Sequence, residues 1–316
     1  MRKKFQREAH NTYPLEELLA IQAPAAPDDF DDFWQSAYSS ILKHNVQVQV
    51  QDSHQIVKNW RVLNVRYNST NNITIAGWLL VPINQAPTRA FIVGHGYAGR
   101  GAPDFDLPFT DAALFFPCCR GLGISHNPPI SSEPHWHVLH DIDKPKQYII
   151  RGCVEDIWLA TSSMLSLFPY LAGKLSFLGI SFTGGIGVLA MAYETRINRA
   201  HFNVPTFGHH RLRLRKSTWG SGHAVQQFFC QQPKMTLKTL RYYDAANAAE
   251  RISMPVHFAL ALKDPVVTPP GQFAIYNHVK SKKQLFVLDE GHSDKYPRKH
   301  EQHQQLLHEL EAFFAI

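Results

Sequence analysis

The first part of the chain shows helical periodicity. Apolar residues recur at helical spacing from Asp29 to Leu42, and a shorter helix is predicted over Pro14 to Ala20. Asp29 and Asp31 stand where side chains commonly cap a helix. Residues 1–45 therefore predict an N-terminal helical arm.

The pattern then changes to the period of two that is typical of strands. Valine alternates with glutamine over residues 46–51, which predicts a strand with one face toward solvent. The alternation returns over residues 63–67, a turn is predicted at 68–72, and a further strand at 73–81. These segments predict β structure directly after the helical arm.

From Phe91 onward, short apolar segments are followed by glycine-rich turns and longer amphipathic segments. This alternation predicts a mostly parallel sheet with helices on both faces, which is an α/β fold, in one domain over residues 1–316. Helices are predicted over 150–165 and 306–314, and residues 206–250, which contain no clear strand, are predicted to form an inserted cap. The predicted strands cover residues 91–93, 113–116, 175–180, 201–204, 256–262 and 285–288.

Composition and charge exclude some classes of function. Hydrophobic residues make up 44% of the chain and charged residues 18%, which is enough apolar material for a large core. The net charge is +6, but the basic residues are scattered, and the only dense run is Arg211, Arg213, Arg215 and Lys216. Without a nucleic-acid-binding motif, this run indicates a solvated face or a lid helix, and no nucleic-acid partner is expected.

The cysteines and the N-terminus indicate where the protein works. Cys118, Cys119, Cys153 and Cys230 have no regular spacing, which argues against a disulfide framework and against a C-x-x-C metal site. Residues 1–4 are basic, but no apolar segment of an export signal follows them, and no apolar run is long enough to span a membrane. We expect a cytoplasmic protein with no membrane partner.

A candidate nucleophile stands at the end of a buried strand. The segment Leu175 to Gly185 contains an apolar strand, then Gly179 and Ser181, and then small residues that begin a helix. This is the arrangement of a nucleophile elbow, in which a strained turn exposes the serine hydroxyl beside a helix N-terminus. Thr183 replaces the second glycine of the usual G-x-S-x-G pattern, so the motif alone is a weak indication.

Two later strands end in residues that complete a Ser-Asp-His order. Asp264 follows the strand over 256–262, and His292 follows the strand over 285–288 on a loop with Gly291. The α/β-hydrolases carry their nucleophile, acid and base in this chain order. The imidazole would accept the proton of the Ser181 hydroxyl, and the carboxylate would orient the imidazole.

Acyl transfer also needs donors for the oxyanion of the tetrahedral intermediate. The backbone N–H of Phe182 is one candidate, and that of Tyr97, in the glycine-rich loop 94–99, is the other. That loop lacks both the phosphate-binding pattern of P-loops and a spaced G-x-G-x-x-G, so no nucleotide cofactor is predicted.

A zinc site is the competing interpretation of the segment His135 to Asp141. Its three histidines resemble the H-x-H-x-D-H signature, but Leu139 occupies the place of the aspartate. The segment follows prolines and serines and is predicted to be a long loop, whereas zinc needs ligands that converge from a rigid frame. We therefore expect a solvated or pocket-lining histidine cluster, with no metal.

Further motifs are spread over most of the chain. They are Asp29 to Trp34, Gly77 to Pro82, His95 to Tyr97, Arg120 to Ser125, Tyr148 to Asp156, the Ser181 elbow, Tyr242 to Asn247, Asp264 to Pro270 and Gly291-His292. In their shared order, these motifs resemble the acetyl xylan esterase and cephalosporin-C deacetylase family, carbohydrate esterase family seven, of α/β-hydrolases. The resemblance implies deacetylation of small carbohydrate esters in the cytoplasm, without a metal, and assembly into a homo-oligomer, commonly a hexamer.

Matched residue by residue, the resemblance places the family's nucleophile at Ser181, its acid at Asp264, its base at His292 and its oxyanion amides at Tyr97 and Phe182. The family's elbow usually reads Gly-Gly-Ser-Gln-Gly-Gly, whereas this chain differs at three of the flanking positions. Two alternatives stay open. An amide or peptide hydrolase can use the same triad, and the fold could also serve a binding protein without catalysis.

Overall fold

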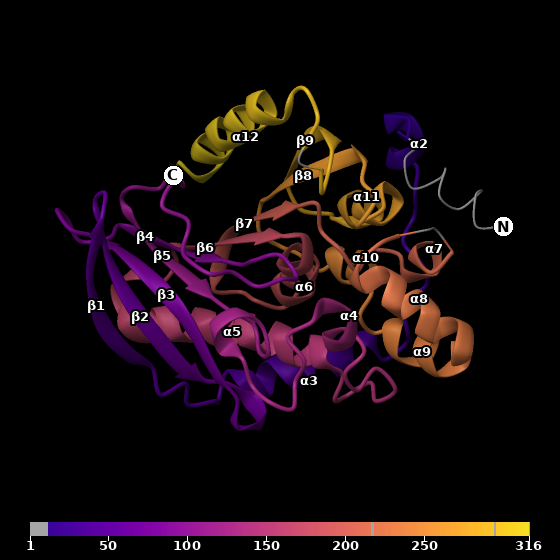
Figure 1. Cartoon of the computed structure of the whole chain (residues 1–316), viewed down its shortest axis with the longest axis horizontal. Helices are drawn as coiled ribbons and strands as arrows, with labels where there is room; N and C mark the ends of the chain where they lie inside the picture. Colours follow the sequence, from indigo (N-terminus) through magenta and orange to yellow (C-terminus); the bar gives the residue numbers. More distant parts are fainter. Residues whose placement is uncertain (1–11, 216–217, 294, 316) are drawn as a thin grey trace.

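Within the described residues, nine strands form a single mixed sheet at the centre of the molecule (Figure 1). The structure is a computed structural model that describes residues 12–215, 218–293 and 295–315. Residues 1–4 and Lys216, on which two predictions rest, lie outside this part of the chain. The strands are β1 (Gln49–Val57), β2 (Trp60–Asn68), β3 (Thr74–Pro82), β4 (Arg89–Val93), β5 (Ala112–Pro117), β6 (Leu175–Ile180), β7 (Ile197–Asn203), β8 (Val256–Lys263) and β9 (Lys283–Glu290).

The strand order is β1-β2-β3-β5-β4-β6-β7-β8-β9. The first three strands and β5 pair antiparallel, and all pairs from β5 to β9 are parallel. The chain passes from β4 to β5 on one side and returns to β6 on the other, where Val93 pairs with Leu178. Ligands of open α/β sheets bind outside the carboxyl ends of the strands at such a switch point.

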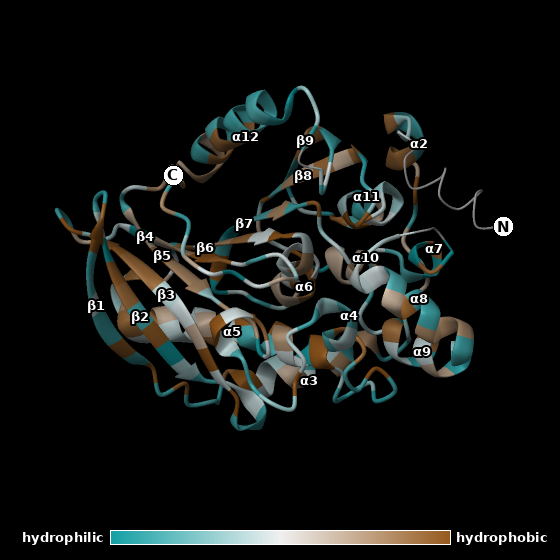
Figure 2. Cartoon of the chain, viewed as in Figure 1, coloured by the Kyte–Doolittle hydropathy of each residue, from teal (hydrophilic) through white to brown (hydrophobic). Residues whose placement is uncertain are grey.

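Helices cover both faces of the sheet, as predicted, and the fold is that of an α/β-hydrolase. Ala90 and Ile92 of β4 face the larger core with α5 and α6, whereas Phe91 and Val93 face a second core with α12. Figure 2 shows the hydrophobic central strands between these layers. The helices are α2 (Leu15–Leu19), α3 (Phe30–Ile41), α4 (Pro134–His137), α5 (Ile149–Leu167), α6 (Ser181–Met191), α7 (His210–Arg213), α8 (Ser221–Gln231), α9 (Pro233–Leu240), α10 (Ala245–Ala249), α11 (Pro269–His278) and α12 (Lys299–Phe314).

The predicted parallel strands are all present. The strand over 175–180 has the predicted bounds, and four others extend by one to four residues. The strand predicted over 201–204 begins four residues earlier, at Ile197, and ends one residue earlier, at Asn203. The prediction for residues 46–51 is wrong in its start and in its wet face, because Gln47 has a left-handed φ of 43° and the strand begins at Gln49. Val46, which precedes the strand, is buried. Val50 is exposed because β1 is an edge strand that is open to solvent on both faces.

The predicted helix caps at the start of α3 are also wrong. Asp29 is the N-cap residue, but its carboxylate makes no cap and accepts a hydrogen bond from the Tyr242 hydroxyl at 2.8 Å. The Asp31 carboxylate accepts one from Tyr193 at 2.7 Å and pairs with Arg251. Both carboxylates therefore bind side chains from distant segments, and neither binds the backbone N–H groups at the helix end that the sequence pattern had indicated.

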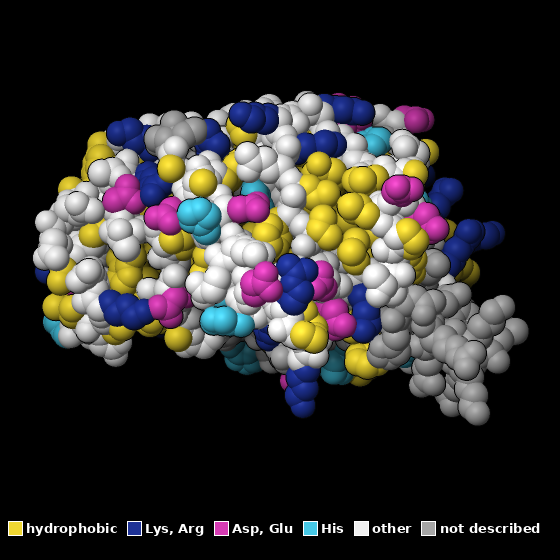
Figure 3. All heavy atoms as spheres, turned by 90° about the horizontal axis from the view of Figure 1, so that it is seen from above, with side chains coloured by type: hydrophobic (Ala, Val, Ile, Leu, Met, Phe, Trp, Pro, Cys, Tyr) yellow, Lys and Arg dark blue, Asp and Glu magenta, His cyan; other side chains and the backbone are white. Residues whose placement is uncertain are grey.

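The surface shows no single-sign field on the face seen from above (Figure 3), where Lys and Arg side chains are interspersed with Asp and Glu around a hydrophobic patch. In the described part of residues 206–250, four helices form, α7 to α10, and α7, α8 and α9 lie at the end of the molecule opposite β1 (Figure 1). In the part of the chain that the structure describes, no helix is both long and apolar enough to cross a membrane.

Candidate functional site

A sharp turn joins β6 to α6 and places Ser181 at its corner. The φ of Ser181 is 51°, in the left-handed region that residues with a side chain rarely adopt. A Cβ atom on Gly179 would lie 2.5 Å from the Thr183 carbonyl oxygen. One on Gly185 would lie 2.2 Å from the Thr206 carbonyl oxygen. Both glycines are therefore required for the turn, which holds the serine beside the N-terminus of α6.

The structure brings Ser181, His292 and Asp264 into one hydrogen-bonded chain. His292 Nε2 lies 2.8 Å from Ser181 Oγ, and His292 Nδ1 lies 2.7 Å from Asp264 Oδ2. Because the carboxylate can only accept, the ring proton belongs on Nδ1, and Nε2 is left to accept the serine proton. The three residues follow β6, β9 and β8, whose carboxyl ends lie at the same edge of the sheet.

Asp264 is held firmly although it stands on a loop. The residue is 2% exposed, and Oδ1 accepts the N–H groups of Val266 and Val267, both at 2.9 Å. Oδ2 also accepts from the Gln272 side chain at 3.2 Å, and that amide's oxygen accepts the Ala261 N–H at 3.0 Å. These bonds fix the orientation of the carboxylate toward His292.

Thr183 takes the place of a glycine in the usual elbow, and the structure shows how it is accommodated. Its side chain is buried and lies against Gly94, where a Cβ atom would be 2.3 Å from Thr183 Oγ1. The Thr183 hydroxyl also lies 3.2 Å from the Ile180 N–H, which donates to it. The space that a glycine in the elbow would leave is therefore provided by Gly94, which directly follows β4.

This contact predicts a rescue between two positions. Gly94→Ala should lower esterase activity by about tenfold or more and destabilise the protein by about 1–3 kcal/mol, because the added methyl overpacks against Thr183. The double variant Gly94→Ala/Thr183→Gly should recover much of both losses, measured by ester hydrolysis and Tm. Simple addition of the two single-variant effects would show that the positions do not interact.

The loop 94–99 is fixed to the elbow through His95. The His95 carbonyl accepts the Thr183 N–H at 3.2 Å. Its buried imidazole accepts the Cys119 N–H at Nε2 (2.9 Å), and Nδ1 lies 2.6 Å from the Gly96 carbonyl oxygen. One neutral tautomer satisfies both contacts, whereas a protonated ring would place a second donor against Cys119.

Tyr97 and Phe182 lie next to each other beside the elbow, with ring centroids 4.2 Å apart. The Tyr97 N–H has no acceptor among the described residues. Phe182 is the second residue of α6, within the first turn, where N–H groups have no intrahelical acceptor. The Phe182 ring is fully buried, so it packs inside the protein while its amide stays at the end of the helix.

A cavity of about 650 Å³ opens at Ser181 and His292. Tyr97 also lines it, as do Lys299 and His303 of α12. The volume lies in the range of small-molecule sites, about 300–1,000 Å³. That α12 reaches this cavity was not predicted, because the helical periodicity of α12 describes only the face that packs on the sheet.

The three histidines of the segment from His135 to Asp141 lie in different environments. The segment contains the short helix α4, where a long loop was predicted. His137 is fully buried, with Nε2 2.9 Å from the Arg120 carbonyl oxygen and Nδ1 3.0 Å from the Tyr97 hydroxyl. His135 contacts the exposed Trp136. Over residues 12–215, 218–293 and 295–315, no three His, Cys, Asp or Glu side chains are grouped as a metal would need.

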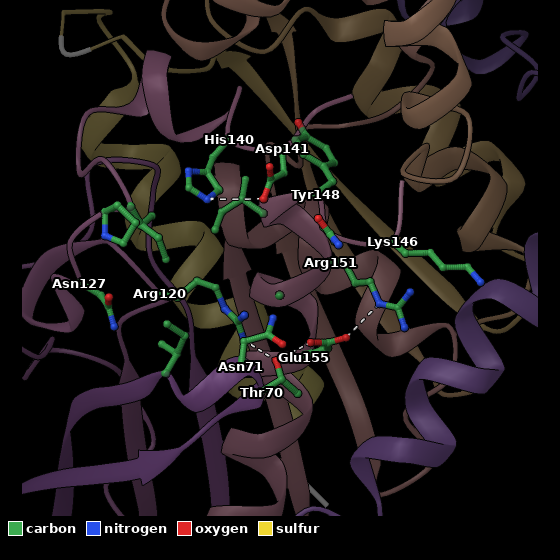
Figure 4. A pocket seen from close by; sticks show the side chains of 16 residues that line it. Thr70, Asn71, Arg120, Asn127, His140, Asp141, Lys146, Tyr148, Arg151 and Glu155 are labelled. Atoms are coloured by element: carbon green, nitrogen blue, oxygen red, sulfur yellow. Dashed lines mark hydrogen bonds and ion pairs between the residues drawn. The ribbon is translucent and has the colours of Figure 1, made fainter. Parts of the chain in front are cut away.

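His140, the third histidine, lines a separate polar cavity of about 620 Å³ (Figure 4). At its floor, Arg120 pairs with the buried Asp156 at 2.7 Å. Figure 4 shows Arg151 paired with Glu155 on another side. Because Arg120 also accepts the hydrogen bond of His137 through its carbonyl, this ion pair supports the histidine that contacts Tyr97.

Buried histidines make the stability of the protein depend on pH. Burial lowers the pKa of His95 to about 4 and that of His210 to about 3. Burial also lowers the pKa of His201 well below its ordinary value. In the unfolded chain these groups bind protons near pH 6.5, so the stability from neutral burial is present above about pH 6.5 and is lost as the pH falls.

Lowering the pH from 7.5 to 5 should therefore cost about 2 kcal/mol for each of His95 and His210. Burial raises the pKa of Asp244 to about 6, and this group offsets about 1 kcal/mol, because the folded state takes up its proton first. The expected fall in Tm is roughly 5 °C. His210→Gln should reduce it, whereas the exposed His308→Gln should not, and an equal Tm at both pH values would contradict the argument.

This chain matches one protein-family model, and its structure is similar to solved structures of one fold. The model of the acetyl xylan esterase family matches residues 9–310. The acetyl xylan esterase from Paenibacillus sp. R4 has a TM-score of 0.82 at 23% identity, over 94% of this chain and 99% of that chain. Acetyl xylan esterase 1 from Thermoanaerobacterium sp. JW/SL YS485 has a TM-score of 0.78 at 19% identity, over 95% of this chain and 99% of that chain.

Larger and less similar proteins also contain the fold of this chain. The Pyrococcus horikoshii acylaminoacyl peptidase has a TM-score of 0.61 at 13% identity, over 81% of this chain and 42% of that chain. At such identities the similarity supports the α/β-hydrolase fold and does not choose between ester and amide substrates.

Proposed function

This chain belongs to the acetyl xylan esterase family and is a carboxylic ester hydrolase, and on that premise we propose that it removes acetyl groups from small acylated carbohydrates with Ser181, His292 and Asp264 as its triad. The observation that carries the proposal is the continuous hydrogen-bonded chain from the serine hydroxyl through the imidazole to the buried carboxylate.

In the proposed mechanism, Ser181 Oγ attacks the ester carbonyl carbon while His292 Nε2 takes its proton. The N–H groups of Tyr97 and Phe182 donate to the oxyanion of the tetrahedral intermediate. His292 then returns the proton to the leaving sugar oxygen, and an acetyl-serine remains. Water attacks this ester with His292 again as base, which releases acetate and restores the serine. Asp264 stabilises the imidazolium at both stages.

Substrate profiling tests the proposal and its alternative. We expect turnover of p-nitrophenyl acetate and of acetylated xylo-oligosaccharides, with a fall in rate as the acyl chain lengthens. Aminoacyl p-nitroanilides should react far more slowly. Cleavage of the anilides without cleavage of acetyl esters would identify an amide or peptide hydrolase, and affinity for the sugars without any turnover would identify a binding protein.

We also propose a cytoplasmic location, a homo-oligomer, as in the hexamers that the family resemblance implies, and a cap-like role for residues 206–250 within one domain. The free cysteines support the location, since Cys118, Cys119 and Cys153 are buried as thiols and Cys230 is exposed as one. Light scattering coupled to gel filtration would give the mass of the assembly directly.

A further inference from the structure

A second ligand site is indicated away from Ser181, in residues 206–250. A cavity of about 430 Å³ is lined by residues of α7, α9 and α10 and by residues 24–26, which precede α3. It shares no lining residue with the cavity at Ser181. Its volume is that of a small-molecule site.

Four cations line this cavity. Lys234 and Lys238 of α9 and Arg241, its C-cap residue with helical φ and ψ, follow one another at i, i+4 and i+7, so they share one face. Arg211 adds a fourth charge from α7. Like charges at this spacing repel each other and destabilise a helix. In the described part of the chain, no ion pair joins any of the four to an acidic side chain.

The one carboxylate that lines the cavity is already occupied. Asp244 is 2% exposed and accepts the N–H groups of His209, His210 and Ala246 at 2.8, 2.7 and 3.1 Å. It therefore serves as a helix cap and leaves the lysines and arginines uncompensated. The His210 imidazole also lines the cavity and lies 3.0 Å from the Tyr243 carbonyl oxygen. The cavity is net positive.

A buried donor in the wall also has no partner. Asn247 lines the cavity and is 3% exposed, and its amide nitrogen makes no hydrogen bond within the described residues. Thr206, Arg213 and Thr239 of the same segment likewise carry buried side-chain atoms without partners. Such unsatisfied atoms are rare in folded proteins and indicate an absent ion, water or ligand.

We propose that this cavity binds a small molecule through an oxyanion group, a phosphate or a carboxylate. The cations supply the charge complementarity, since Arg211 and Arg241 can donate two parallel hydrogen bonds to such a group and the lysines act as point charges. The Asn247 amide supplies a neutral donor at the wall. The site lies outside the proposed acyl-transfer machinery, so its occupancy does not depend on that function.

Calorimetric titration of the full chain tests the proposal, with glucose 6-phosphate, glucuronate and neutral glucose as probes. We expect saturable binding of at least one anionic sugar and none of glucose. Binding of the phosphate alone, the carboxylate alone, or both identifies the source of the anion. No saturable binding of either anionic sugar would overturn the proposal.

Charge-matched variants separate a built site from general attraction. Lys234→Gln/Lys238→Gln should weaken binding at least tenfold, whereas Lys43→Gln/Lys282→Gln, which removes two exposed lysines elsewhere, should leave it within twofold. Asn247→Asp, which keeps the shape but replaces the donor by an acceptor, should also weaken binding tenfold, with folding checked by Tm. Equal losses in the first two variants would contradict a specific site.

Discussion

Replacing Ser181 by alanine is expected to lower kcat/KM for p-nitrophenyl acetate by about 10³-fold or more. The hydroxyl is the atom that bonds to the acyl carbon, and the neighbouring His292 cannot replace it without a shift of the loop. Tm should change little or rise, because the side chain is small and its left-handed backbone conformation is kept. Initial rates over a range of substrate concentration measure the effect.

Ser293 is the matched control for this variant, since it lines the same cavity, while the His292 ring forms its hydrogen bonds within the described residues to Asp264 and Ser181. Ser293→Ala should retain activity within a few-fold. Equal rates for Ser181→Ala and the unmodified protein would end the assignment of the nucleophile.

Asp264→Asn should lower kcat by about 10³- to 10⁴-fold, with KM changed far less. The N–H groups of Val266 and Val267 both donate to Oδ1 of the aspartate, so the oxygen of an asparagine would stay there. Its NH₂ group would then face His292 Nδ1 and donate to it. The ring would carry its proton on Nε2, and could no longer accept the proton of Ser181.

Asp289→Asn provides the control, because Asp289 lies near the end of β9, close to His292 in the chain, but contacts Gln302 and Arg298 and not the imidazole. It should keep most of the activity. An Asp264→Asn enzyme within tenfold of the unmodified one would show that another group orients His292.

The positions of Ser181, Asp264 and His292 could be predicted because each depends on a local pattern. Each follows an apolar strand, and parallel strands bring their carboxyl ends to one edge whatever lies between them in sequence. The bounds of β6 were predicted correctly for the same reason, since a buried strand is a continuous apolar run ended by small residues.

Other features could not be predicted because they depend on contacts between distant segments. Gln272 reaches Asp264 from α11, and nothing in its own neighbourhood marks it as a partner. The compensation of Thr183 by Gly94 joins the first turn of α6 to the loop after β4, which only the fold places side by side. Asp29 was predicted to cap the helix from its local sequence, but its carboxylate accepts a hydrogen bond from Tyr242, a tertiary partner, in place of the N–H groups at the helix end.

The most direct test of the account is covalent labelling with an active-serine phosphonate, followed by mass spectrometry of the peptides. We predict a single adduct, on Ser181, which forms in step with the loss of esterase activity and does not form in Ser181→Ala. An esterase that loses its activity while the adduct lies on another residue, or one that resists the reagent altogether, would contradict the proposed nucleophile.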